Sequence, residues 1–247
     1  MFKPGSRLYR PSLRLFSSGL ALAFTFFLII PAHSTGSEAS ILAFIFQDDT
    51  FITCKISTAV FNPQVYAELH QPPALPDDLP GSWDVRNALD ADFTGDDIAE
   101  LALLVWRPWR DWPFMRWSKG PSPIADFHDE QGDSCHIILI DPNPGGKSSE
   151  RSLTLYKHSY REIWAGSALP VPLVQIAAGD VNGDGLVDLV ALEGDYESGR
   201  DGAGHCVSIW QWNGFGFTME WRSEPGCFAG LAVQDVNNDE IIDIIAW

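Results

Sequence analysis

The chain has 247 residues, of which 45% are hydrophobic and 12% aromatic, and its formal net charge is −17 at pH 7. This length and composition exclude a disordered chain and allow one sizeable hydrophobic core or two small ones. The excess of acidic residues argues against a nucleic acid as partner, because nucleic-acid-binding surfaces are basic.

Residues 1–34 have the pattern of an export signal. Four basic residues and no acidic residue precede the apolar stretch LFSSGLALAFTFFLII, and Ala-His-Ser at 32–34 offers a cleavage site. We expect a cleaved secretory signal peptide, with a retained membrane anchor through residues 15–30 as the alternative. In both cases the rest of the chain is secreted, periplasmic or at the cell surface. That exported part has 12 basic and 33 acidic residues, a net charge of −21.

The segment 35–69 is expected to contain a β-hairpin. The apolar runs ILAFIFQ and FITCKIS flank the turn-like pair Asp48 and Asp49. The proline-rich stretch HQPPALPDDLPG, residues 70–81, predicts a linker. A repeat domain, residues 82–247, follows it.

Three copies of one acidic motif organise the repeat domain. They read DFTGDDIAE at 92–100, DVNGDGLVD at 180–188 and DVNNDEIID at 235–243, each between two short apolar segments. In the first two copies CHIILID and HCVSIWQW predict a third strand, and LTLYKH and FTMEW a fourth. The unit is therefore expected to be a four-stranded antiparallel sheet. The last copy has only two strands, and we hypothesise that the N-terminal hairpin completes it.

Oxygen-bearing side chains on alternate positions around a tight turn predict a calcium site. Calcium takes six to eight oxygen ligands, here expected from positions 1, 3, 5 and 9 and from the carbonyl of position 7. These ligands are Asp92, Thr94, Asp96, Ile98 and Glu100; Asp180, Asn182, Asp184, Leu186 and Asp188; and Asp235, Asn237, Asp239, Ile241 and Asp243. The alternative is a set of loops whose carboxylates only cap backbone amides.

The three loops are not equivalent. Only the second has a glycine, Gly185, at position 6, where the chain needs a positive φ. Glu240 and Asp97 occupy that position in the third and first loops, and Thr94 is a weaker ligand than an amide or a carboxylate. We therefore expect affinity to decrease from the second loop to the third and then to the first.

With these motifs, the chain resembles the FG-GAP, or VCBS, repeat family, which includes the β-propeller blades of integrin alpha chains. The closest match is AAGDVNGDGLVDLVALEG, and the resemblance extends over residues 83–247. It implies an all-β fold of FG-GAP-type four-stranded antiparallel blades, in a partial or small β-propeller with Ca²⁺-binding loops. It also implies an extracellular location and binding rather than catalysis. Family propellers commonly have seven blades, whereas this chain shows three motifs.

An insertion between the second and third strands of the first copy contains WRPWRDWPFMRW. Exposed tryptophans and arginines are common at interfaces and stack on ligand rings. The candidate ligand-binding or partner-binding residues are Trp106, Arg107, Trp109, Arg110, Trp112, Arg116 and Trp117. The alternative is a satellite core in which these aromatics pack over the sheet.

The remaining motifs restrict the function further. The four cysteines permit disulfides, with Cys206 to Cys227 slightly favoured, and no CxxC, HExxH or GxSxG pattern occurs. We expect an exported calcium-binding repeat protein that acts as a binding or interaction module for a protein or carbohydrate ligand at the cell surface. The alternatives are an extracellular carbohydrate-active enzyme with the insertion as substrate platform, and a purely structural repeat protein.

Overall fold

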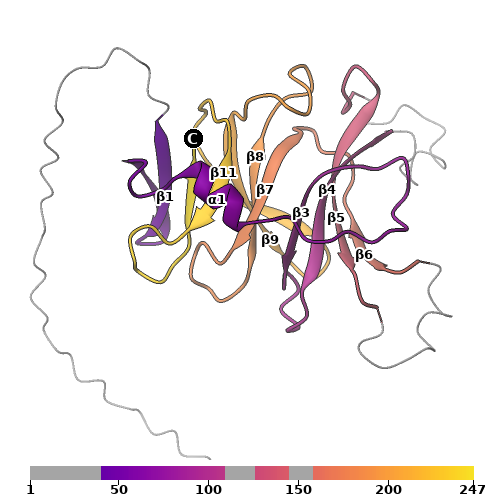
Figure 1. Cartoon of the computed structure of the whole chain (residues 1–247), viewed down its shortest axis with the longest axis horizontal. Helices are drawn as coiled ribbons and strands as arrows, with labels where there is room; N and C mark the ends of the chain where they lie inside the picture. Colours follow the sequence, from indigo (N-terminus) through magenta and orange to yellow (C-terminus); the bar gives the residue numbers. More distant parts are fainter. Residues whose placement is uncertain (1–39, 109–125, 145–157) are drawn as a thin grey trace, which may run out of the picture. The chain divides into compact units, whose positions relative to one another are not determined.

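Three four-stranded antiparallel sheets make up the fold of the computed structural model, which describes residues 40–108, 126–144 and 158–247 (Figure 1). The first sheet has the order β3 (Asp84–Ala91), β4 (Glu100–Pro108), β5 (Asp133–Asp141) and β6 (Arg161–Ala165). The second has the order β7 (Leu173–Gly179), β8 (Asp188–Glu193), β9 (Cys206–Trp212) and β10 (Phe217–Arg222). This confirms an all-β fold built from four-stranded antiparallel units.

The third sheet combines strands from the two ends of the repeat region. Its order is β11 (Leu231–Gln234), β12 (Asp243–Ala246), β1 (Ile41–Gln47) and β2 (Thr50–Ile56). In the β1–β12 pair, Leu42 lies opposite Ala246 and Phe44 opposite Ile244. The indigo hairpin accordingly lies beside the yellow C-terminal strands in Figure 1. The hypothesis that the N-terminal hairpin completes the last copy is confirmed.

The fourth strand of the first sheet lies later in the chain than expected. LTLYKH was predicted to form it, but β6 begins at Arg161, and residues 153–157 lie outside the described part of the chain. The register explains the difference. Trp164 lies opposite Leu139, next to a register shift, just as Trp221 lies opposite Ile209 in the second sheet. The repeated element is this tryptophan and the irregularity beside it, not the apolar run before it.

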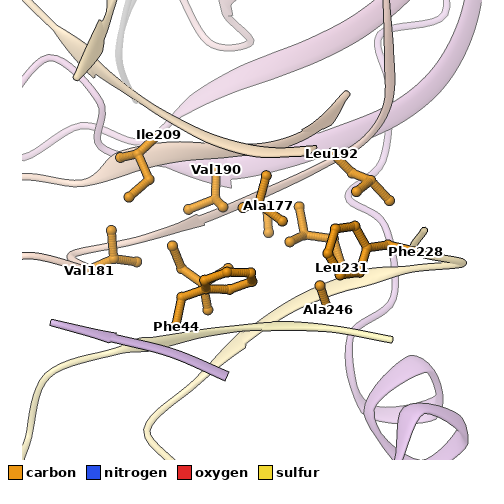
Figure 2. Packing of buried hydrophobic residues seen from close by; sticks show 11 residues of the cluster. Phe44, Ala177, Val181, Val190, Leu192, Ile209, Phe228, Leu231 and Ala246 are labelled. Atoms are coloured by element: carbon orange, nitrogen blue, oxygen red, sulfur yellow. The ribbon is translucent and has the colours of Figure 1, made fainter. Parts of the chain in front are cut away.

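Hydrophobic cores fill the spaces between neighbouring sheets. In Figure 2 side chains of the second sheet, including Val190 and Ile209, point toward Phe44, Leu231 and Ala246 of the third. An equivalent cluster joins the first and second sheets through residues such as Leu104, Ile137, Leu139, Ile176, Leu189 and Ala191. Alternating inward positions of strands from two sheets therefore share one core at each junction.

Residues 57–83 cover the other faces of the first and third sheets. Phe61 and Tyr66 pack on the third sheet beside Ile245, whereas Leu79 and Trp83 pack on the first. The segment includes the one helix in the described part of the chain, α1 (Pro63–Leu69). Asn62 caps it by accepting hydrogen bonds from two backbone amides, and proline follows at the first helical position, where its missing N–H costs nothing.

Side-chain amides connect the sheets along the inner strands β3, β7 and β11. Asn87 Oδ1 accepts a hydrogen bond from the amide of Ile176 at 2.9 Å. Gln175 donates to the carbonyl of Leu231 at 2.8 Å and accepts from its amide at 2.9 Å. These strands and the segment after α1 surround an open cavity of about 900 Å³.

The favoured disulfide between Cys206 and Cys227 is absent, and all four cysteines are free thiols. The two sulfhydryl-bearing side chains have different environments, since Cys206 is buried and Cys227 is exposed. Burial also raises the pKa of the Cys135 thiol to about 12.

No helix within the described residues is long and apolar enough to span a membrane. The predicted signal or anchor, residues 1–34, lies outside those residues.

The mixed third sheet yields a stability prediction. Phe44 is 3% exposed and makes edge-to-face ring contacts with Trp221 and Phe228, at centroid distances of 5.5 and 6.5 Å. Phe44→Ala should lower the free energy of unfolding by about 3–5 kcal/mol, because it leaves a cavity in the core. Phe215→Ala is the matched control, since Phe215 is 87% exposed, and should change it by less than about 0.5 kcal/mol. Equal effects in urea denaturation would contradict the observed packing.

Candidate metal centre

The three acidic loops occupy the same place in the three sheets. They connect β3 to β4, β7 to β8 and β11 to β12, and the ninth residue of each motif is the first residue of the following strand. These closing residues, Glu100, Asp188 and Asp243, are 2%, 0% and 1% exposed. The carboxylate that ends each loop is therefore placed in the protein interior by the strand that begins there.

Each loop reverses direction with two residues of positive φ, at the fourth and sixth positions of the motif. The pairs are Gly95 and Asp97, Gly183 and Gly185, and Asn238 and Glu240. The sixth position was expected to adopt this conformation, and Asp97 (φ 65°) and Glu240 (φ 73°) do so without being glycine. A non-glycine residue in this region costs about 1 kcal/mol or more, so only the second loop avoids the cost entirely.

The first aspartate of each motif holds the turn by accepting backbone amides. In the second loop Asp180 Oδ1 accepts from the amides of Gly183 and Asp184 at 2.7 and 3.1 Å, and Oδ2 accepts from Gly185 at 2.9 Å. Asp92 makes the same three bonds in the first loop, and Asp235 accepts from Asn238 and Glu240 in the third. A carboxylate has about four lone-pair sites, so these bonds leave capacity for a cation.

The third and fifth positions bond to each other in the second and third loops. Asn182 donates to Asp184 Oδ2 at 3.2 Å, and Asn237 donates to Asp239 Oδ2 at 2.8 Å. In the second loop Gln211 of β9 also donates to Asp184 Oδ2 at 2.7 Å. Gln211 was not among the expected site residues, because it lies outside the motif and reaches the loop only through the pairing of the strands.

The closing carboxylates of the second and third loops are incompletely paired. Asp188 Oδ2 accepts one hydrogen bond, from the amide of Val181 at 3.3 Å, and Asp243 Oδ2 accepts one from Val236 at 2.9 Å. Among the described residues, Oδ1 of each has no hydrogen-bond partner although it is buried. A buried, unpaired carboxylate oxygen is costly unless a cation or a proton compensates its charge.

The pKa values of these carboxyls reflect that environment. Desolvation, together with the charges of Asp184, Asp180 and Glu220, raises the pKa of Asp188 to about 7. The pKa of Asp243 is raised by desolvation and by its neighbours Asp239 and Asp235. Without a bound cation, both groups therefore favour the protonated form more than an exposed aspartate does.

The first loop satisfies its closing carboxylate internally. Glu100 Oε1 accepts from the Thr94 hydroxyl at 2.9 Å, and Oε2 accepts from the amides of Phe93 and Thr94 at 2.9 and 3.3 Å. Its pKa is raised by desolvation, an effect that these bonds oppose. Carboxylate oxygens of Asp92, Asp96 and Glu100 lie within 4.8 Å of one another, and among the described residues this is the only group of three acidic, histidine or cysteine side chains close enough to hold a metal ion.

The loops contact one another in a row. A side chain added at Gly95 of the first loop would meet Leu186 of the second at 3.6 Å. One added at Gly183 of the second would meet Ile241 of the third at 3.3 Å. The seventh residue of the second loop and that of the third thus each pack on the fourth residue of the loop before, a contact that the motif spacing alone did not predict.

The five expected positions of each motif therefore lie in one loop and in the first residue of the strand that follows it. The residues of the insertion that were expected to bind a ligand are not shown to form a binding surface. Trp106 and Arg107 belong to β4 and are 1% and 6% exposed, so their side chains do not form an exposed surface as expected. The other five, Trp109, Arg110, Trp112, Arg116 and Trp117, lie outside the described residues.

Arg200 is one of the residues that cover Trp106. Its guanidinium lies over the Trp106 ring at 5.1 Å from the centroid and forms ion pairs with Asp84, Asp129 and Asp133. Three carboxylates compensate this partly buried cation, and the cluster joins the β8–β9 connection to the first sheet. At this position the satellite-core alternative describes the packing better than a binding surface does.

The oxygen donors described above fit a hard cation, because carboxylate, amide and carbonyl oxygens are the ligands that calcium and magnesium take. Comparison with known proteins adds no family to this picture: no protein-family model, no curated protein and no solved structure matches the chain.

Proposed function

We propose that the chain is an exported calcium-binding repeat protein that acts as a binding or interaction module outside the cytoplasm. In this proposal Ca²⁺ occupies the acidic loops and fixes the first residues of β4, β8 and β12. The sheets, in the manner of propeller blades, then present exposed loops and crevices to a protein or carbohydrate ligand.

The observation that carries the proposal is the pair of buried, unpaired carboxylate oxygens, Asp188 Oδ1 and Asp243 Oδ1. A loop that only capped backbone amides would have no reason to bury a ninth-position carboxylate without a partner. A divalent cation supplies the missing partner and offsets the repulsion among the acidic residues of the loop.

The donor set favours calcium over other metals. Each loop offers acidic or neutral oxygens and no thiolate or imidazole, which argues against zinc and copper. The turn is short and offers both side-chain and backbone oxygens, a mixture that suits the variable coordination of calcium. Extracellular calcium modules work at dissociation constants of about 10⁻⁴ to 10⁻³ M, in keeping with the exported location that we propose.

Asp188→Asn tests the role of the closing carboxylate. In chelator the variant should be more stable than the wild type, because it removes a desolvated charge and an amide oxygen can still accept from Val181. A gain of about 1 kcal/mol corresponds to roughly 2–4 °C in Tm for a domain of about this size. In calcium the variant should lose at least half of the increase in Tm that the wild type shows, because a charged ligand is missing.

The control is Asp77→Asn, which removes one exposed carboxylate from the proline-rich segment and should leave both melting temperatures unchanged. If Asp188 only capped the loop, its replacement should leave the calcium-induced increase in Tm intact. The proposal also fails if calcium does not raise the Tm of the wild-type protein.

The pKa of Asp188 predicts how stability and affinity change with pH. Between about pH 4 and pH 7 the folded, metal-free protein keeps a proton on Asp188 that the unfolded chain has released. The stability of the metal-free protein should therefore fall as the pH rises through this range. Calcium competes with that proton, so calorimetric affinity at the second loop should be about tenfold weaker at pH 6 than above pH 8. An affinity independent of pH, or a metal-free protein that becomes more stable from pH 4 to 7, would contradict this assignment.

A further inference from the structure

A second cavity, of about 410 Å³, opens between the second and third sheets beside the second acidic loop. It lies at the end of the sheets where the β1–β2 turn and the β7–β8 loop are found. Its walls are formed by Phe46, Asp49, Thr50 and Phe51 of the hairpin, by Asn182, Gly183 and Asp184 of the loop, and by Ile209, Glu220 and Trp221 of β9 and β10. Its volume is in the range of small-ligand sites.

The repeat provides an internal comparison for this cavity. Strand pairing places Phe51 opposite Phe46 in the third sheet and Phe217 opposite Trp212 in the second, so these pairs are equivalent. The crevice between the first and second sheets contains Trp212 and Phe217 together with Phe93 and Trp164. The corresponding crevice between the second and third sheets contains Phe46 and Phe51, with Val181 and Trp221 beside Phe51.

Aromatic side chains fill the first of these crevices. Phe217 makes edge-to-face contacts with Phe93, Trp164 and Trp212, at centroid distances of 5.6, 5.7 and 5.4 Å. In the second crevice valine replaces Phe93 and phenylalanine replaces Trp212. The smaller side chains account for the hollow, and the rings that remain, Phe51 and Trp221 at 4.9 Å, form an aromatic wall.

The hollow crevice also carries negative charge. Trp164 and Trp221 are equivalent, so Glu220 stands where the first sheet has Ile163. Across the described residues, neither Glu220 nor Asp49 forms a side-chain hydrogen bond or an ion pair, and both are exposed. No basic residue belongs to the described lining of the cavity. The more open of the two crevices is thus also the more acidic one.

We propose that this crevice binds the cationic side chain of an arginine or lysine residue on a basic peptide. Aromatic faces attract organic cations, and carboxylates at the rim pair with guanidinium or ammonium groups. The net charge of −17 would also draw a basic partner toward the protein. The proposal deepens the binding role proposed above and rests on it, because Asn182, Gly183 and Asp184 belong both to the cavity wall and to a calcium loop.

The test uses a capped, dye-labelled peptide, Gly-Arg-Gly-Arg-Gly, in fluorescence polarisation with the whole exported chain at 1 mM Ca²⁺ and 150 mM NaCl. This ionic strength suppresses long-range attraction to the acidic surface. The labelled peptide should bind saturably, and unlabelled peptide should displace it. The peptide with citrulline in place of arginine should compete at least tenfold more weakly, because it keeps the shape and loses the charge. Equal competition by the citrulline peptide would overturn the proposal.

Two variants locate the site. Glu220→Gln and Asp49→Asn should each weaken binding of the arginine peptide at least fivefold. Both change exposed side chains and are expected to fold. Glu224→Gln, on an exposed neighbour outside the cavity, should bind like the wild type. Equal weakening by all three variants would mean general attraction to the acidic surface and would refute the site.

Further arms separate this proposal from the calcium proposal and identify the source of the cation. If calcium raises the Tm but the peptide does not bind, only the cationic site is wrong. If the peptide binds as described and calcium leaves the Tm unchanged, the site stands and the calcium role fails. Competition by butylguanidinium as strong as that of the peptide would support the cationic chemistry and assign it to small organic cations. Weaker competition would assign it to a peptide.

Discussion

A carboxylate at the start of a buried strand is the constraint on which much of this structure depends. In each sheet the ninth residue of the acidic motif closes a loop and is also the first residue of the next strand, which is β4, β8 or β12. The strand then continues with nearly complete burial, as in Asp188–Glu193. The charge cannot move to solvent without pulling the strand out of two hydrophobic cores. The protein must therefore compensate that charge where it lies, by hydrogen bonds, a proton or a cation.

The three loops resolve this constraint in different ways. In the first, the Thr94 hydroxyl and two amides satisfy Glu100. In the second and third, the third-position residue is an asparagine that bonds to the fifth position instead, and one oxygen of the closing aspartate has no partner among the described residues. A carboxylate that is already satisfied gains less from a cation, whereas only the first loop brings three acidic side chains within 4.8 Å of one another among the described residues. The order of affinity among the loops therefore stays a prediction.

The sequence predicts the parts of the fold that depend on local pattern. Alternate acidic residues around a glycine define the loops, and the flanking apolar runs define β3, β4, β7, β8, β11 and β12. The pairing of β1 with β12 follows from counting strands, because an incomplete sheet leaves an unpaired edge. The predicted position of the fourth strand of the first sheet was wrong. Apolar content indicates LTLYKH, whereas the feature common to β6 and β10 is a tryptophan beside a register shift. Helix α1 was missed although Asn62 and Pro63 form a recognisable start signal.

Other features depend on contacts between distant segments, which a single sequence does not display. Trp106 contacts Arg200, about ninety residues later, whose guanidinium is held by three acidic partners. The contact of Leu186 with Gly95 requires two sheets to stand beside each other at a fixed offset. The packing of residues 57–83 on the sheets could not be predicted either, because a proline-rich composition indicates a connection but not the sheet faces that the connection covers. The first and last sheets of a repeat array have apolar faces that no neighbouring sheet covers. This segment packs on the first and third sheets and buries those faces.

The repeated architecture also makes the differences between copies informative. Two crevices with the same strand register are built from equivalent positions, and a packed crevice needs every one of those positions to be large and apolar. Phe93, Ile163 and Trp212 meet that requirement between the first and second sheets, whereas the next crevice has the smaller Val181 and Phe46 and the charged Glu220 at these positions. Stability alone favours the filled arrangement, since a hollow forfeits dispersion contacts and a carboxylate in it adds repulsion near Asp188. A cavity that opposes stability, and that shares three residues with an acidic loop, is better explained by a ligand than by packing. Because Gly183 of that wall also contacts Ile241, a cation in either loop would stiffen the same side of the crevice.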